Sequence, residues 1–415
     1  MNILFVSQNY HPFVGGIETH VRQVAHELAK KHTVKVAAVN FQPTQLPVRL
    51  QVLSGDLLAP SFHSYQDGEV AVTALTPTWL DRVRLFPIAV RALPVLQRYA
   101  YQSLKQFGYF WYKFILVPKL ESLMQDVDVV HCLGGEYLGW AAQAAAHKRG
   151  IPFVATPFVH PRQWGDDQPN IEYYQRCEAV IALLESDRQN LLDIGVPAEK
   201  IHVIGVSPDL PASTNPQSFR QQHGLEDVPV VLYIGRMMPQ KGAKALLEAA
   251  PLVWEQVPNT HFVFIGPALP GSEKWFEKQD ARVHHLGRVD MQTKADALAG
   301  CDIFCMPSIS EILPTVYLEA WSYGKPVVGG LAHGLPELVE GNGAGLASSQ
   351  KPVELAGNLT MLLREPQQSQ KMGLLGKQLV EQSYSVAAVT EALEILYTEQ
   401  ITPDNRTILV GSLVG

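Results

Sequence analysis

Two carboxylates on either side of a predicted helix start, Glu311 and Glu319, could bind a polar ligand. The apolar run at 302–306 predicts a buried strand that ends at Pro307, and Pro314 suits the first turn of the helix that follows. Free N–H groups at a helix start suit a phosphate, and an acid on each side of it can accept hydrogen bonds from hydroxyls. This arrangement fits a nucleotide sugar, with the sugar at one end, the diphosphate at the helix and the ribose at the other end. The alternative is an ordinary half-buried helix with one solvated and one capping glutamate.

Two cations follow the apolar run at 228–235. Arg236 and Lys241 lie on a loop between this predicted strand and a predicted helix over 243–257. Arginine offers a fork of N–H groups and lysine a point charge, so the loop suits a diphosphate. We find no His or Cys cluster with metal-ligand spacing, and no DxD-like metal site near these groups. The sequence therefore predicts no metal site, and the positive loop would take the place of a metal.

The first half of the chain contains two further candidates for ligand binding, a glycine pair and a histidine. Gly15 and Gly16 stand between the first apolar run and a stretch of helical spacing, where glycine lets the backbone approach an anion or a sugar closely. The pair can equally be a simple turn. His160 follows the apolar run at 152–156, at the strand end where α/β proteins bind ligands. His131 lies inside a predicted strand, which favours a core role.

Composition narrows the class of protein. The chain has 415 residues, enough for two sizeable domains, and is 47% hydrophobic and 18% charged, which predicts a folded protein. A net charge of −7 argues against a nucleic-acid partner. The short apolar start at 1–6 lacks basic residues and predicts a first strand rather than a signal peptide, and no uncharged apolar run reaches membrane-spanning length. The four cysteines form no CxxC pair, so we expect reduced core thiols and a cytoplasmic protein.

The stretch 80–120 differs from the rest of the chain. It holds seven Lys or Arg residues against a single acid, Asp81, together with many aromatic residues. Basic amphipathic helices with aromatics can lie on an anionic membrane, here its inner face, but they can equally be ordinary helices that cover a sheet. We expect acceptor recognition in this segment, with a sugar, a lipid-linked compound or a polysaccharide as the acceptor.

Several motifs, in order, resemble those of the retaining GT-B glycosyltransferases of family four, and the resemblance spans nearly the whole chain apart from 43–120. The family's approximate Glu-Gly-Phe-Gly-Leu-Pro-x-x-Glu-Ala motif begins here at Glu311, with Ile312 in place of the first glycine. The other matching stretches are the opening loop Tyr10–Glu18, the Gly-Arg-x-x-x-x-Lys-Gly loop at 235–242, Gly287-Arg288-Val289, and the Gly-x-Pro-Glu turn at 334–337.

The resemblance implies a GT-B fold, an α/β architecture of two facing Rossmann-like domains with parallel sheets and an interdomain cleft. The expected parts are an acceptor-binding domain at 1–206, a linker at 207–227, a nucleotide-sugar domain at 228–383, a returning helix at 384–402 and a tail at 403–415. It implies transfer of a sugar from a nucleotide diphosphate sugar to an acceptor hydroxyl with retention, and no cofactor beyond that co-substrate. The implied catalytic residues are His160, Arg236, Lys241 and Glu311. The implied donor-binding residues are Gly15, Gly16, Arg236, Lys241, Arg288, Val289, Glu311, Pro314, Thr315 and Glu319.

Two alternatives stay open at this point. One is a nucleotide-sugar epimerase on the same fold, which would turn over its substrate without an acceptor. The other is a catalytically weak relative that binds a nucleotide sugar within an assembly, a possibility raised by Ile312. The residues do not single out one nucleotide base, one sugar or one acceptor.

Overall fold

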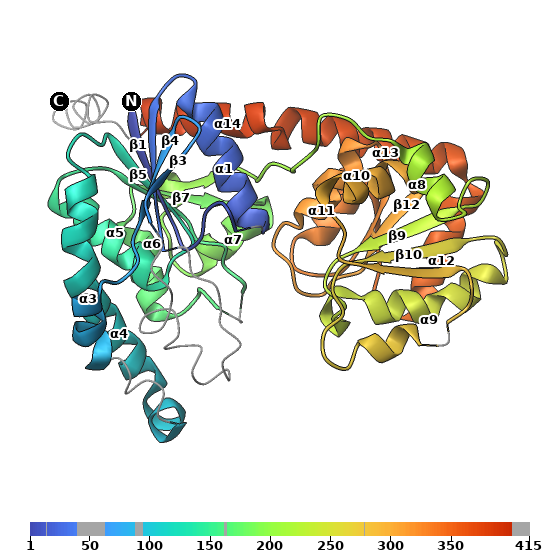
Figure 1. The fold of residues 1–415 in the computed structure, drawn as a ribbon, viewed down its shortest axis with the longest axis horizontal. Coiled ribbons are helices and arrows are strands. Elements are labelled where there is room, and N and C mark those ends of the chain that lie inside the picture. The colour runs from blue at the N-terminus through green and yellow to red at the C-terminus, as the bar shows by residue number, and fades with distance from the viewer. Residues whose placement is uncertain (14, 40–62, 88–93, 162–163, 278, 401–415) are drawn as a thin grey trace. The chain divides into compact units, whose positions relative to one another are not determined.

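The chain folds into two compact units (Figure 1). The computed structural model describes residues 1–13, 15–39, 63–87, 94–161, 164–277 and 279–400, without side chains at 85, 94–105, 109, 399 and 400. The N-terminal unit comprises Met1–Leu183, Asp187–Ile204 and the described chain from Val389 onward, and the C-terminal unit comprises Leu184–Ser186 and Gly205–Ala388. The predicted tail, 403–415, lies outside the described residues.

The N-terminal unit is built on an eight-stranded sheet in the order β3-β4-β2-β1-β5-β6-β7-β8. Its strands pair in parallel except β3, which is antiparallel to β4. The strand order reverses between β1 and β5, so the loops that follow these two strands meet at the edge where parallel sheets bind ligands. The strands are β1 (Asn2–Ser7), β2 (Thr33–Ala38), β3 (Tyr65–Asp67), β4 (Val70–Ala74), β5 (Val129–Leu133), β6 (Phe153–Thr156), β7 (Ala179–Ala182) and β8 (Ile201–Val203).

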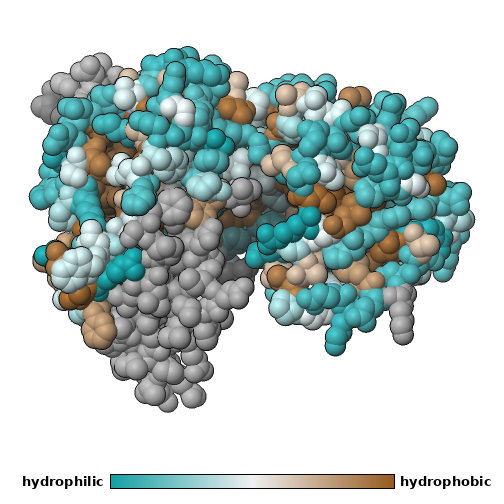
Figure 2. Space-filling view, viewed as in Figure 1, coloured by the Kyte–Doolittle hydropathy of each residue, from teal (hydrophilic) through white to brown (hydrophobic). Residues whose placement is uncertain are grey.

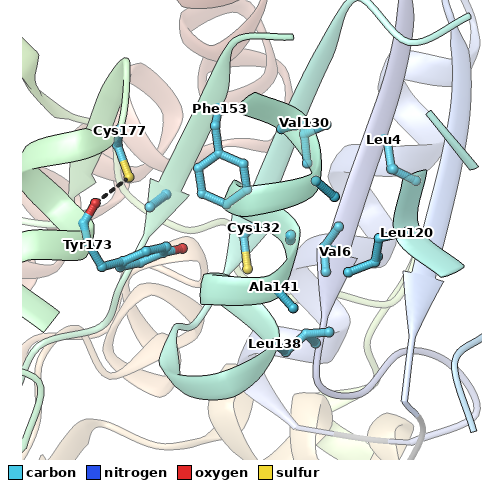
Figure 3. Close-up of a cluster of buried hydrophobic side chains, with 14 of the residues drawn as sticks. Leu4, Val6, Leu120, Val130, Cys132, Leu138, Ala141, Phe153, Tyr173 and Cys177 are labelled. Carbon is cyan, nitrogen blue, oxygen red and sulfur yellow. Dashed lines mark hydrogen bonds between the residues drawn. The ribbon is translucent and has the colours of Figure 1, made fainter. Parts of the chain in front are cut away.

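The main core of this unit lies between the sheet and three helices, α4, α5 and α6 (Figure 3). Val6 and Phe153 project from the strands, and Leu120, Ala141 and Tyr173 meet them from the three helices. Continuous apolar strands of this kind are typical of parallel sheets covered by helices. The helices are α1 (Gly16–Ala29), α3 (Trp79–Leu85), α4 (Pro94–Leu123), α5 (Glu136–Lys148), α6 (Gln168–Arg176), α7 (Glu185–Asp193) and α14 (Val386–Ile395), with the short π-helical segment η8 (Leu396–Gln400).

The C-terminal unit contains a six-stranded, fully parallel sheet in the order β11-β10-β9-β12-β13-β14. Counted from its first strand this is the order 3-2-1-4-5-6 of dinucleotide-binding folds, and its direction reverses between β9 and β12. The loops after these two strands therefore stand at the expected ligand site. The strands are β9 (Val230–Ile234), β10 (His261–Ile265), β11 (Val283–Gly287), β12 (Ile303–Met306), β13 (Val327–Gly329) and β14 (Gly345–Ala347).

One predicted boundary differs from the structure. The stretch 207–227, predicted to be a linker, belongs to the C-terminal unit and contains a helix, α8. Pro216 begins that helix, the side chain of Asn215 accepts a hydrogen bond from the Ser218 N–H at 3.1 Å, and Phe219 is buried. The helices of this unit are α8 (Pro216–Gln222), α9 (Ala243–Trp254), α10 (Met291–Gly300), α11 (Thr315–Ser322), α12 (Pro352–Arg364) and α13 (Pro366–Leu379).

The prediction of two α/β domains with parallel sheets is confirmed. The chain passes between the units near 204–205 and again near 388–389, close to the predicted positions 206 and 384. Among the helices that the structure describes, none combines the length and the apolar character needed to cross a bilayer.

Candidate functional site

The loops after β9 and β12 are joined by hydrogen bonds between backbone and side chains. The carbonyl oxygen of Gln240 accepts from the Ile309 N–H at 2.9 Å and from the Ser308 hydroxyl at 3.2 Å. The side-chain amide of Gln350 adds bonds to the carbonyls of Gln240, at 3.2 Å, and Pro307, at 2.8 Å. These contacts hold the two loops together where the strand order changes direction between β9 and β12.

Two glycines allow close approaches at this edge of the sheet. Gly242 has a φ of +84°, and a Cβ at this position would lie 2.5 Å from Cγ of Pro307, so a side chain would push the loops after β9 and β12 apart. Gly330 follows β13, and a Cβ there would lie 1.8 Å from the carbonyl oxygen of Ser308, so a side chain would separate the loop after β12 from the end of β13.

Lys241 and Glu311 are brought together by these loops. The ammonium of Lys241 pairs with Oε1 of Glu311 and donates to the Ser310 carbonyl at 3.1 Å. Both side chains are largely buried. An ammonium has three N–H donors, so one donor of Lys241 is left for a ligand within the described structure.

Arg236 lies on the same loop as Lys241, after β9. Its carbonyl oxygen accepts a hydrogen bond from the Tyr233 hydroxyl at 3.0 Å, while its guanidinium is exposed and forms no ion pair with any described residue. Burial raises the pKa of Tyr233, the charge of Glu311 raises it further, and Arg236 lowers it. Both charges therefore act on one buried tyrosine.

Helix α11 begins beside these charges. Pro314 is its N-cap residue and Thr315 its first residue, and no side chain caps the helix, so its first N–H groups are open to an acceptor. The Tyr317 hydroxyl donates to the Met306 carbonyl at 2.6 Å and accepts from the Gly330 N–H at 3.1 Å. The helix start is thus fixed to the ends of β12 and β13.

Glu319 lies one turn further along α11 and is 4% exposed. Its Oε1 accepts from the Lys294 ammonium at 2.9 Å, whereas Oε2 is buried and has no hydrogen-bond partner in the described structure. Burial raises the pKa of Glu319, and Lys294 opposes that rise. Lys294 was not identified from the sequence, because its pairing depends on how α10 packs against α11.

Arg288 and Val289 lie at the carboxyl end of β11, two strands away from β9. Gly287, with a φ of +65°, precedes them, and Asp290 follows as the N-cap of α10, where its side chain accepts from the Thr293 N–H at 2.8 Å. Arg288 is exposed. The predicted donor residues 288 and 289 therefore lie at the same edge of the sheet as the loops after β9 and β12. They take no part in the hydrogen bonds and ion pair described for those loops.

The remaining predicted residues lie in the N-terminal unit. Gly15 is the N-cap residue of α1 and Gly16 its first residue, on the loop that follows β1. His160 stands beyond the end of β6, where its backbone pairs with that of Trp164 and the two rings lie 5.0 Å apart. Phe158, just before it, has a φ of +53°, a conformation that is uncommon outside glycine and often found near functional sites.

Two family models match successive parts of the chain. The model described as Glycosyltransferase Family 4 matches residues 14–206, and the model described as Glycosyl transferases group 1 matches residues 215–379. The chain belongs to the family-four, group 1 glycosyltransferases. The resemblance stated from the sequence motifs is thereby confirmed, and so is the prediction of a hexosyltransferase.

Curated relatives of this glycosyltransferase are themselves named glycosyltransferases. The alpha-D-kanosaminyltransferase of Streptomyces kanamyceticus is 26% identical over 295 residues, which cover 65% of this chain and 76% of the relative. A GDP-mannose-dependent monoacylated alpha-(1-6)-phosphatidylinositol monomannoside mannosyltransferase of Corynebacterium glutamicum is 32% identical over 192 residues. That match covers 43% of this chain and only half of the relative's own length.

The fold of the glycosyltransferase is that of solved GT-B structures. HepE of Anabaena, solved in complex with UDP and glucose, superposes with a TM-score of 0.66 at 21% identity, covering 95% of this chain and 98% of HepE. The predicted GT-B architecture of two Rossmann-like domains is therefore confirmed at the level of the fold.

Proposed function

We propose that this glycosyltransferase transfers a sugar from a nucleotide diphosphate sugar to an acceptor hydroxyl with retention of the anomeric configuration. The placement of Arg236 and Lys241 on the loop after β9, with Lys241 paired to Glu311 just before the uncapped start of α11, carries this proposal. Together they supply two cations and free N–H groups where the strand order reverses, which suits a departing nucleotide diphosphate.

The proposed chemistry is departure of the diphosphate. As the bond between the anomeric carbon and the phosphate oxygen breaks, negative charge grows on that oxygen, and Lys241 and Arg236 stabilise it. The acceptor oxygen then bonds to the same face of the sugar, and its proton passes to the departing phosphate oxygen. Glu311 orients the sugar and the Lys241 ammonium, and His160 is proposed to hydrogen-bond the sugar. In this proposal the positive loop does the work of a metal, and no cofactor takes part.

A nucleotide-release assay with UDP-, GDP- and ADP-sugars and a lipid extract as acceptor tests the proposal. Because Lys241 acts on charge that develops in the transition state, Lys241→Ala should lower kcat/KM by about 100- to 1,000-fold. Lys244→Ala is the matched control, since Lys244 is an exposed lysine of α9 that pairs only with Glu248 on the next turn.

Two results would count against this function. Conversion of one nucleotide sugar into its epimer, without nucleotide release, would favour the epimerase. Equal rates in Lys241→Ala and Lys244→Ala would remove Lys241 from the transfer step.

We also propose that the acceptor is lipid-linked and that the protein acts at the cytoplasmic face of a membrane, which it touches through α3 and α4. The relative from Corynebacterium glutamicum is named for a phosphatidylinositol mannoside acceptor. The four buried, unpaired cysteines suit a reducing compartment.

The surface of α3 and α4 supports membrane contact. Trp79, Phe86, Phe110 and Phe114 are 71%, 70%, 67% and 70% exposed, and Figure 2 shows apolar side chains at the surface over these helices. The two helices lie side by side, since the Trp111 indole donates to the carbonyl of Arg84. Arg82, Arg84 and Lys113 add positive charge, while Asp81 is buried and paired with Lys119. Exposed aromatics with cations suit an anionic bilayer.

Vesicle co-sedimentation tests this contact. We expect binding to vesicles that contain phosphatidylglycerol, weaker binding to pure phosphatidylcholine, and loss of binding in a Phe110→Ser, Phe114→Ser variant. Val353→Ser removes an equally exposed apolar side chain on α12 and should leave binding unchanged. Equal sedimentation of both variants would contradict the proposal.

A further inference from the structure

Glu319 has a buried carboxylate, and only one of its two oxygens has a hydrogen-bond partner within the described structure. Lys294 bonds to Oε1 at 2.9 Å, and Oε2 has no hydrogen-bond partner within the described structure. A buried polar atom without a partner is costly, and native proteins rarely retain one unless a ligand or water completes it. The unpaired oxygen can therefore accept from a hydroxyl or N–H donor that a ligand or a water supplies.

The position of Glu319 on α11 suggests which part of the ligand this is. It lies four residues beyond Thr315, which corresponds to about 6 Å along the helix axis. If the diphosphate lies at the helix start, the nucleoside next to it comes within reach of Glu319. Carboxylate oxygens accept well from neighbouring hydroxyls, so a ribose is the group that fits.

The charged groups that face Glu319 come from three elements. Lys294 of α10 supplies the positive charge, and Asp209, from the segment before α8, supplies a negative one. Tyr323, one turn further along α11, has a buried hydroxyl without a described partner, and Asp296 of α10 acts on that tyrosine. Among these groups Lys294 alone favours the charged carboxylate.

We propose that Lys294 is a positioning residue for nucleotide recognition: by holding Oε1 of Glu319, it turns the carboxylate so that Oε2 accepts from a ribose hydroxyl. This inference rests on the proposed function, because it needs a nucleotide at the start of α11. It assigns to Lys294 a role in distinguishing ribose from deoxyribose, although Lys294 itself does not touch the sugar.

Calorimetric binding of UDP, GDP and ADP, each beside its 2′-deoxy and 3′-deoxy form, tests the proposal. The wild type should bind one ribonucleotide about tenfold or more tightly than a deoxy form, the effect of one hydrogen bond to a charged group. In Lys294→Met the ratio of ribonucleotide to deoxynucleotide affinity should fall close to one. In Lys294→Arg part of the wild-type ratio should remain. Lys244→Met, on the exposed face of α9, should behave as the wild type.

The pH dependence separates positioning from a purely structural role. Burial raises the pKa of Glu319 and Lys294 lowers it, so loss of Lys294 should raise this pKa further. Because the ionised carboxylate accepts the hydrogen bonds, ribonucleotide affinity falls as pH drops through the pKa. That fall should begin at a higher pH in Lys294→Met than in the wild type.

The results of these binding experiments distinguish failure of the inference from failure of the proposed function. An unchanged ribose preference in folded Lys294→Met, with an unshifted pH profile, overturns the inference and leaves the proposed function standing. If Lys294→Met fails to fold, Glu319→Gln replaces it, and a retained ribose preference in that variant also overturns the inference. Absence of binding by UDP, GDP and ADP to the wild type overturns the proposed function and this inference together.

Discussion

Asp67 is the residue that fixes the surroundings of the glycine loop in the N-terminal unit. Its carboxylate, on β3, accepts from both Nε and Nη2 of Arg22 at 2.8 Å, from Nε2 of His26 at 3.0 Å and from the Tyr10 hydroxyl at 3.2 Å. Burial by itself would raise the pKa of Asp67, but the hydrogen bonds from Arg22 and His26 outweigh it and hold that pKa well below its usual range. One carboxylate thus connects β3, α1 and the loop after β1.

Asp67→Asn should lower the free energy of unfolding by about 1–3 kcal/mol at pH 7, because the amide breaks a network around a buried group. Since the folded pKa is depressed, the stabilisation by the carboxylate is present above the unfolded pKa of about 4 and is lost as the pH falls further. Thermal melts between pH 3 and 8 should therefore show the variant approaching the wild type at the acid end.

Glu69→Gln provides the control for Asp67→Asn, because Glu69 is an exposed carboxylate in the turn between β3 and β4. If the difference in stability between Asp67→Asn and the wild type stayed constant down to pH 3, Asp67 would stabilise the fold by packing and not by its charge.

At the scale of elements, the last helical segment of the described chain completes the N-terminal unit. Tyr397 of η8 hydrogen-bonds Nδ1 of His131 in β5, and Nε2 of His131 pairs with the Thr156 hydroxyl at 2.7 Å. Burial lowers the pKa of His131 to about 3, so this histidine is neutral and serves the core, as its place inside a strand predicts. Glu394 of α14 adds an ion pair to Lys31 at 2.9 Å.

Tyr397→Phe should lower the melting temperature of the N-terminal unit, because Nδ1 of His131 loses its partner in a buried site. The expected cost is about 1–3 kcal/mol. Thr398→Ala, one residue further along, removes an exposed hydroxyl that donates to the Glu394 carbonyl one turn earlier, and it should change the melting temperature little. Equal melting temperatures for both variants would contradict the role given to Tyr397.

The elements that the sequence predicted are those with strong local patterns. The buried strands around Val130 and Phe304 are continuous apolar runs, and the start of α11 was predicted at Pro314, one residue before its first helical residue. The sequence analysis did not identify β3, because three residues carry no period and only pairing with β4 defines the strand. Helix α8 was missed although Asn215 followed by Pro216 is a recognisable helix start.

The candidate site likewise contains residues that the sequence predicts and a residue pair that it does not. Arg236, Lys241 and Glu311 can be predicted because they lie beside predicted helix starts, within motifs that resemble those of the family. The pairing of Lys294 with Glu319 was not predicted, since a cation on one helix finds its partner on another only through packing. Such pairs need the tertiary structure.

At the scale of the whole molecule, the proposed donor groups Arg236, Lys241, Glu311 and Glu319 all belong to the C-terminal unit. The N-terminal unit contains α3 and α4, where the acceptor and the membrane are proposed to be met, and it also contains His160, which is proposed to hydrogen-bond the donor sugar. Binding of the nucleotide should therefore depend mainly on side chains of the C-terminal unit.

The measurement that tests the central claim most directly is thermal stabilisation by UDP, GDP and ADP, compared between the wild type and Arg236→Ala. A nucleotide at a hundred times its dissociation constant should stabilise the wild type by about 2.7 kcal/mol. Arg236→Ala should lose most of this shift, whereas Arg364→Ala, an exposed arginine of α12 that contacts Gln256, should keep it. A full shift in Arg236→Ala, or no shift with any nucleotide in the wild type, would contradict the donor site described for the loops after β9 and β12.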